Sequence, residues 1–276
     1  MKGYILLDIF WTYLVYIPVC HWVWGNGFLA KWGFVDFAGG TVIHTTAGFA
    51  ALASIIVLGK RKLKQAGMKP SNLMAAAIGT GLLWFGWFGF NSGGALKAGA
   101  LSTKAFANTA IGLASGMIVW VLYAKFVRGK ANFIDVLTGS VAGLATITPC
   151  AGYISPAAAV LVGLAAGIIC NVAVSLQEKI GWDDALGVWG VHGIGGFTGT
   201  ILIGILADKT VNGVAASGHQ FLIQAGGVIL VAAYSFAVTF ILLKVLGAIT
   251  NIRPSDEIIQ EGLDHTLLNE TTYDID

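Results

Sequence analysis

The chain has 276 residues, of which 56% are hydrophobic and only 11% are charged, and its formal net charge is +2. A soluble domain usually carries about 25% charged residues, so too few charges remain here to cover a water-facing surface. The small net charge also gives no indication of nucleic-acid binding. The composition therefore predicts an all-α protein embedded in a membrane.

Eight apolar segments are long enough to cross a bilayer, which takes about 20 residues for one helix. Several are interrupted by glycine, and Pro18 lies late in the first. Membrane helices tolerate both residues, because glycine lets backbones approach closely and neighbouring helices satisfy the groups that a proline frees. The expected spans are 4–23, 37–59, 73–92, 105–127, 133–153, 156–178, 185–207 and 222–249.

Basic residues are distributed unevenly between the two sides that eight spans define. Twelve lie on the side of the termini and four on the other. Because cytoplasmic loops carry an excess of Lys and Arg, both termini are expected in the cytoplasm. Residues 1–250 are expected to form the transmembrane domain and residues 251–276 a cytoplasmic tail. This polar, acidic tail is either a solvated end or a docking segment.

Two of the expected spans begin with one pattern, Asp-x2-Gly-x4-His-x3-Gly-Phe. It starts at Asp36 in the second span and at Asp184 in the seventh, and these spans cross in opposite directions. Related segments of opposite direction are typical of inverted-topology repeats, whose binding sites lie near the bilayer midplane. Each aspartate is expected to cap a helix start, where a carboxylate accepts from free N–H groups. The alternative is that the carboxylate binds a cation directly.

His44 and His192 each follow the aspartate by eight residues, which is about 12 Å into the membrane at 1.5 Å per residue. An ionisable side chain at that depth indicates a function. A neutral imidazole has one donor and one acceptor nitrogen, so two paired rings can line an apolar lumen without a fixed charge. We therefore expect both histidines to line one pathway, and the others (His21, His219 and His265) to lie at interfaces or in the tail.

Aromatic residues gather around Trp24 at the end of the first span and over residues 84–90 of the third. Two interpretations are open. The residues are an aromatic belt at the membrane interface, or they form a vestibule in which an indole attracts a cation and the Phe90 ring closes the path behind it.

The chain resembles the ammonium transporter family (the Amt/Mep/Rh group), and most of all its bacterial and archaeal Amt members. The stretches that carry the resemblance are YIPVCHWVWGNGFLAKWGFVDFAGGTVIH, LLWFGWFGFNSGG, TPCAGYISP, DDALGVWGVHGIGG and EGLDHTLLNE. The resemblance implies an eleven-helix fold in which two halves of five helices are inverted. It also implies that this chain carries family helices four to eleven and lacks the first three, with the outer gate phenylalanine.

Roles for individual residues follow from the resemblance. Gly94 stands where many members have a serine in the outer site, so one hydrogen-bond acceptor is lost there. The implied roles are pore lining for His44, His192 and Trp87, outer cation binding for Trp24 and Gly94, gating for Phe90, and structural support for Asp36, with Asp184 as its counterpart in the repeat.

The implied function is transport of ammonium or ammonia across the cell membrane by a homotrimer with one pore in each subunit. Many family members are blocked by a PII-type regulatory protein at the cytoplasmic face. The alternative is a non-conducting, ammonium-sensing or regulatory subunit that binds a PII-type protein or full-length subunits. We expect no cofactor and no enzymatic activity, because the sequence has no nucleophile constellation, phosphate loop or metal-ligand spacing around its three cysteines (Cys20, Cys150 and Cys170).

Overall fold

The computed structural model describes residues 2–62 and 70–270, and every regular element in this part of the chain is a helix. Four short π-helical segments, with hydrogen bonds from i to i+5, interrupt or extend the α-helices. The α-helices are α1 (Lys2–Trp11), α2 (Ile17–Trp24), α3 (Phe28–Lys31), α4 (Thr46–Leu58), α5 (Leu73–Gly93), α6 (Ala100–Val127), α7 (Phe133–Ile147), α8 (Pro156–Ile180), α9 (Ile194–Leu206), α10 (Lys209–Asn212), α11 (Gly218–Ile249) and α12 (Asp256–Glu261); the π-helices are η1 (Thr12–Tyr16), η2 (Gly40–Thr45), η3 (Val188–Gly193) and η4 (Asp264–Leu268).

Seven helical stretches within the described residues are long and apolar enough to cross a membrane. They overlap seven of the eight expected spans, so the prediction of an all-α membrane protein is confirmed. These stretches are Lys2–Lys31, Gly40–Leu58, Leu73–Gly93, Ala100–Val127, Pro156–Ile180, Val188–Leu206 and Gly218–Ile249.

The eighth expected span, 133–153, forms a shorter helix than predicted. Helix α7 ends at Ile147, and residues 148–153 continue as turns. Its 15 residues span about 22 Å, less than the roughly 30 Å hydrocarbon core. Ten of them are buried, in contact with α6, α8 and α9. Because protein surrounds this helix, its length does not have to match the bilayer.

A proline interrupts the first span without ending it. Pro18 has no N–H to donate, and the chain responds with the π-helix η1, in which the Ile17 N–H bonds the Thr12 carbonyl five residues back. Helix α2 continues from Ile17 with the proline in its first turn. The Leu14 carbonyl, four residues before Pro18, accepts instead from the Tyr234 hydroxyl at 2.6 Å.

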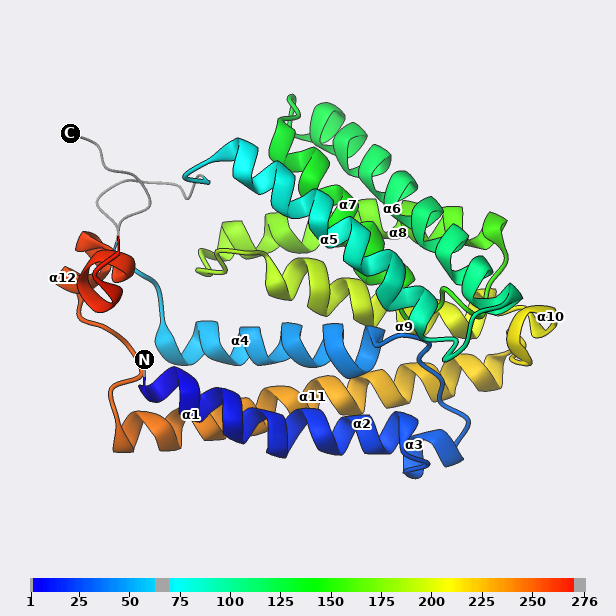
Figure 1. Cartoon of the computed structure of the whole chain (residues 1–276), viewed down its shortest axis with the longest axis horizontal. Coiled ribbons are helices and arrows are strands. Elements are labelled where there is room, and N and C mark those ends of the chain that lie inside the picture. Colours follow the sequence, from blue (N-terminus) through cyan, green and yellow to red (C-terminus); the bar gives the residue numbers. More distant parts are fainter. Residues whose placement is uncertain (1, 63–69, 271–276) are drawn as a thin grey trace.

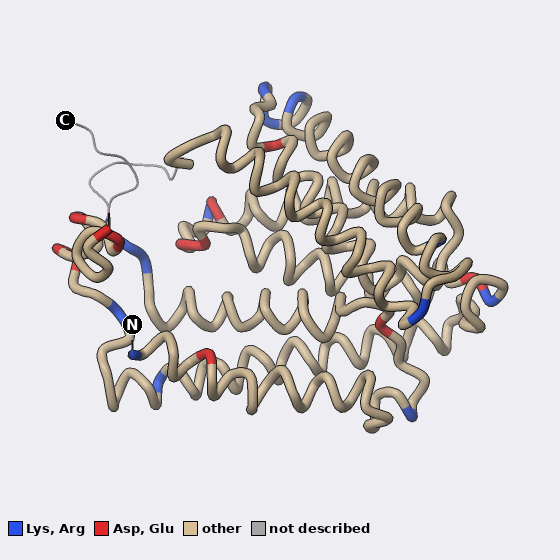
Figure 2. The backbone as a smooth tube through the Cα atoms, in the orientation of Figure 1, with Lys and Arg blue, Asp and Glu red and all other residues tan. Residues whose placement is uncertain are grey.

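The N-terminus and helix α12 lie at one end of the bundle, and α3 and α10 lie at the other (Figure 1). Charged residues gather toward the helix ends, and few of them lie along the middle of the bundle (Figure 2). A bilayer favours this distribution, since a charge at its centre is costly.

The two histidine-bearing spans are built alike and run in opposite directions (Figure 1). Each begins as a π-helix, η2 or η3, and continues as a 13-residue α-helix, α4 or α9. In both, the glycine of the Asp-x2-Gly pattern has a positive φ, 114° at Gly39 and 63° at Gly187, which glycine adopts without steric cost. The repeat in the sequence is therefore also a repeat in structure.

Glycine residues let these two spans cross at very short range. A Cβ atom on Gly48 would lie 2.1 Å from the Cα of Gly193. One on Gly196 would lie 2.2 Å from the carbonyl oxygen of Gly40. Since neither place has room for a side chain, the two glycines set the separation of α4 from η3 and of α9 from η2.

The tail contacts the loop that follows α4. Arg253 donates to the carbonyl oxygens of Leu58 and Lys60, at 2.5 and 3.0 Å. Lys62 forms an ion pair with Asp256 in α12. The described part of the tail is thus attached to the membrane-spanning part by polar contacts.

We predict that Gly48→Ala destabilises the protein, because its methyl group would overlap the Gly193 backbone and overpacking of this kind costs about 1–3 kcal/mol. Thermal unfolding in detergent, followed by tryptophan fluorescence, measures the effect. Gly79→Ala in α5 is the matched control, since its Cβ would meet nothing within 4 Å. Equal unfolding temperatures for the two variants would contradict the prediction.

Candidate functional site

The structure brings the two histidines of the repeat together. Nδ1 of His44 lies 3.3 Å from Nδ1 of His192, which is hydrogen-bonding range. His44 is 6% exposed, and its Nε2 is buried with no partner among the described residues. A contact between two Nδ1 atoms needs one donor and one acceptor, so one ring is protonated at Nδ1 and the other is not.

The aspartates of the repeat hold the π-helical turns that carry these histidines. Both carboxylate oxygens of Asp36 accept backbone N–H groups, from Gly39 and Gly40 at one oxygen and from Thr41 and Val42 at the other, at 2.7–3.0 Å. This set satisfies donors that a helix start leaves free.

Asp184 does the same for η3 with fewer bonds. It accepts from the N–H groups of Val188 at 3.0 Å and Trp189 at 2.9 Å. The two aspartates therefore act on matching turns, and in both cases the bonding fixes the helix start that precedes a histidine by a few residues.

Trp87 forms a wall beside the histidine pair. Its ring stacks on His44 at 5.1 Å between centroids and lies 6.0 Å from His192 at an interplanar angle of 10°. Its indole N–H donates to the hydroxyl of Thr148 at 2.9 Å, so the orientation of the ring is fixed. Phe90 lies near both, 6.1 Å from the His44 ring and 6.2 Å from the Trp87 ring.

Three cavities in this region share lining residues. We call the cavity that contains Trp24 the outer cavity, the one that contains both histidines the middle cavity, and the one that contains Arg61 the inner cavity. The outer and middle cavities have Ile43 and Phe90 in common, and the middle and inner cavities have Val188 in common. The middle cavity, of about 430 Å³, is lined by Ile43, His44, Ala47, Leu82, Leu83, Gly86, Trp87, Phe90, Val188 and His192. Apart from the imidazoles and the indole, its lining is entirely apolar.

The outer cavity, of about 650 Å³, contains the remaining predicted site residues Trp24, Asp36 and Gly94. Trp24 is held by a hydrogen bond from its indole N–H to the Asp36 carbonyl at 2.8 Å. Tyr153 and Asn212 also line this cavity. All the predicted site residues except Asp184 therefore line the outer or the middle cavity, and Asp184 lines the inner one.

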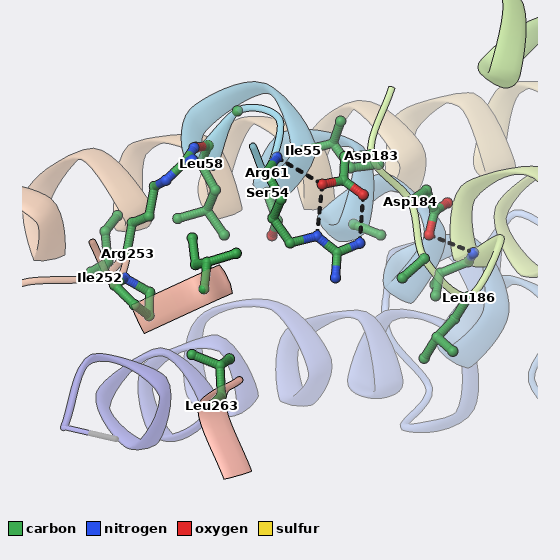
Figure 3. A pocket seen from close by; sticks show the side chains of 16 residues that line it. Ser54, Ile55, Leu58, Arg61, Asp183, Asp184, Leu186, Ile252, Arg253 and Leu263 are labelled. Carbon is green, nitrogen blue, oxygen red and sulfur yellow. Dashed lines mark hydrogen bonds and ion pairs between the residues drawn. The ribbon is translucent and has the colours of Figure 1, made fainter. Parts of the chain in front are cut away.

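The inner cavity, of about 440 Å³, lies where the tail meets the loops after α4 and before η3 (Figure 3). Arg61 donates to Asp183 from its backbone N–H at 2.9 Å and its Nε at 2.7 Å. These bonds hold the pKa of Asp183 below its ordinary value, chiefly through the Arg61 side chain. Ile252 and Leu263 of the tail contribute apolar lining.

Sequence reasoning missed several residues of the site. Ile43 precedes His44 directly, and Val188 precedes His192 by four residues, which is the same face of a helix. That spacing was the available signal for Val188. Thr148, which orients Trp87 from 61 residues away, carried no local signal. Within the described ranges no group of three or more His, Cys, Asp or Glu side chains is placed to hold a metal.

Comparisons with known proteins identify the class to which this helix bundle with two histidines in contact belongs. The sequence profile of the Ammonium Transporter Family matches residues 1–273. The chain is 45% identical to a putative ammonium transporter of Methanothermobacter thermautotrophicus, over 99% of this chain and 68% of the relative. It is 40% identical to the ammonium transporter Amt1 of Archaeoglobus fulgidus, over 99% of this chain and 71% of that protein.

The fold is also similar to solved structures. The crystal structure of Candida albicans Mep2 superposes with a TM-score of 0.87 at 36% identity, covering 93% of this chain and 61% of that one. The chain thus spans about two thirds of the length of such relatives. These matches show that the chain belongs to the ammonium transporter family, and the resemblance stated from the sequence is confirmed.

We predict that Asp36→Asn destabilises the protein more than Asp184→Asn. An asparagine side chain has one acceptor oxygen, so the first change leaves two of four N–H groups without a partner and the second leaves one of two. Each unsatisfied buried group costs about 1–3 kcal/mol. Unfolding temperatures in detergent measure the order, and an equal or larger loss for Asp184→Asn would contradict it.

Proposed function

We propose that the chain conducts ammonium or ammonia across the cell membrane along the three cavities. The observation that carries the proposal is the contact of His44 with His192 in an otherwise apolar cavity, with one buried nitrogen left unpaired. Membership of the ammonium transporter family supports the same substrate. No observation among the described residues favours a non-conducting regulatory subunit or an enzyme.

The outer cavity is the proposed place where the cation is recruited. The Trp24 indole offers an aromatic face, and its N–H is already engaged by the backbone. Asp36 supplies negative charge from behind, but both its oxygens are occupied by N–H groups. We therefore assign it a structural role and a contribution to the local field, and we assign the same structural role to Asp184.

The middle cavity is the proposed place where the guest crosses in neutral form. Phe90, which the outer and middle cavities share, is the proposed gate between them. Beyond it, the apolar lining offers no compensation for a full charge, whose burial without a partner is costly. Ammonia can instead exchange hydrogen bonds with the free imidazole nitrogen, while Trp87 keeps the rings in line.

The proposal includes the orientation of the chain in the membrane and its assembly. The distribution of basic residues supports a multi-pass protein with both termini of the chain in the cytoplasm, a transmembrane domain over residues 1–250 and a cytoplasmic tail over 251–276. From the resemblance to the family we extend to this chain a homotrimer with one pore in each subunit and a PII-type partner at the cytoplasmic face.

We predict that His44→Ala and His192→Ala each abolish uptake of labelled methylammonium, because each change removes one half of the hydrogen-bonded pair. Uptake by proteoliposomes containing the purified protein measures this. His219→Ala, an exposed histidine at the start of α11, is the matched control and should transport normally. Uptake that survives in both pore variants would end the proposal.

We also predict that a reporter fused to the C-terminus stays on the cytoplasmic side. The basic loops lie at the same end of the bundle as the tail (Figures 1 and 2), so a C-terminal green fluorescent protein should fluoresce and a C-terminal alkaline phosphatase should be inactive. The opposite pair of results would reverse the proposed orientation without affecting the histidine pathway.

A further inference from the structure

Helix α11 carries a glutamine that is completely buried. Gln224 is 0% exposed, in a helix that packs against both α4 and α9 of the inverted spans (Figure 1). An amide side chain has two donor hydrogens and can accept two hydrogen bonds, and burying it without partners is costly. The partners of Gln224 therefore show what this side chain holds in place.

Gln224 uses its full hydrogen-bonding capacity. Its Oε1 accepts from the Val35 N–H at 2.9 Å and from Gln220 Nε2 at 3.1 Å. Its Nε2 donates to the Val35 carbonyl at 2.8 Å and to the Thr200 carbonyl at 3.2 Å. The amide thus bonds both backbone groups of one residue, Val35, and joins that residue to α9.

Val35 needs this amide because it lies outside the helices. Residues 34–36 form no regular element between α3 and η2, and buried backbone groups that lack a helical partner are satisfied in another way. Three residues after Gln224, and hence on the same face of α11, a Cβ atom on Gly227 would lie 2.3 Å from a ring carbon of Phe34. Two neighbouring positions of α11 therefore hold this segment.

Asp36, which follows Val35 directly, orients two parts of the site. Its carboxylate caps η2, the π-helix that contains His44. Its carbonyl accepts the hydrogen bond from the Trp24 indole. A displacement of Val35 would consequently move both the aromatic wall of the outer cavity and the start of η2.

The second half of the repeat is attached to the same amide. Thr200 lies in α9, the helix that continues from η3, and its hydroxyl contacts the hydroxyl of Thr41 in η2 at 2.7 Å. Gln224 bonds the carbonyl of the same threonine. The amide therefore fixes the start of one inverted span against the other, from a helix that belongs to neither.

We propose that Gln224 is a positioning residue for transport, which holds the segment before Asp36 against α9 and so places the Trp24 indole and η2 relative to each other. The assignment rests on the proposed function. Gln224 is not among the described residues that line the three cavities, so it acts through Asp36 and not by contact with the substrate.

Uptake of methylammonium by proteoliposomes separates this role from a purely structural one. Gln224→Leu removes all four hydrogen bonds of the amide. It should raise the concentration that gives half-maximal uptake roughly 10-fold, because misplacing a group in a site by about 1 Å can cost up to about 100-fold. Half-saturation does not depend on how much of the protein is folded, whereas a loss of stability alone lowers only the maximal rate.

Thr239→Val is the matched control on the same helix. Thr239 is 1% exposed, and its hydroxyl accepts from the Trp11 indole N–H at 3.0 Å, so this change also removes a buried hydrogen bond between helices. It leaves the bonds of Val35 and Thr200 in place. Thr239→Val should lower the unfolding temperature in detergent and leave half-saturation unchanged.

A backbone variant tests the same contact without changing the glutamine. Replacement of Val35 by the corresponding α-hydroxy acid exchanges its N–H for an ester oxygen, which removes one of the four bonds of Gln224. Half-saturation should rise, by a smaller factor than in Gln224→Leu. If Gln224→Leu yields no folded protein, this variant decides the question.

The outcomes are distinct. Unchanged half-saturation in Gln224→Leu or in the ester variant would overturn the assignment, while uptake by the unchanged protein would still support the proposed function. An equal rise in Thr239→Val would also overturn it, because the loss of any hydrogen bond of α11 would then have the same effect. Absence of uptake by the unchanged protein would overturn the proposed function and this assignment with it.

Discussion

The contacts of Gly48 with Gly193 and of Gly196 with Gly40 determine how closely the two inverted spans approach. In a bilayer there is little hydrophobic force between helices, so van der Waals packing at small residues decides their association. Here the crossing lies in the same turns that carry the histidines, four residues from His44 to Gly48 and four from His192 to Gly196. The same crossing of the two spans therefore produces both the two glycine contacts and the contact between the imidazoles.

The π-helical starts have a clear relation to the aspartates. A π-helix is wider than an α-helix and is seldom stable over more than a turn, so η2 and η3 need support for their first N–H groups. Asp36 supplies four acceptor contacts and Asp184 two. The left-handed glycine in each motif lets the chain turn back over the carboxylate. The sequence pattern thus encodes a cap, a turn and a helix start as one unit.

Much of this could be predicted because the signals are local. The spacing of the repeat indicated inverted spans, and hydropathy located seven of the membrane helices. The short α7 was missed because its length depends on burial by α6, α8 and α9, which a hydropathy pattern does not contain. The π-helical turns were missed because the Asp-x2-Gly pattern is also compatible with an ordinary helix cap. The bond from Trp87 to Thr148 joins distant positions and needs the packed structure.

The outer and middle cavities differ in the charge of the guest that each would favour. In the proposed pathway, the outer cavity recruits the cation, because it offers an indole face with a carboxylate behind it. At the middle cavity the rings share one proton between their Nδ1 atoms, and the remaining buried Nε2 of His44 has no partner in the described protein. Leaving that nitrogen unsatisfied costs about 1–3 kcal/mol, which supports the proposal that a small polar guest binds in this cavity. A neutral guest meets this need without the larger cost of a buried charge.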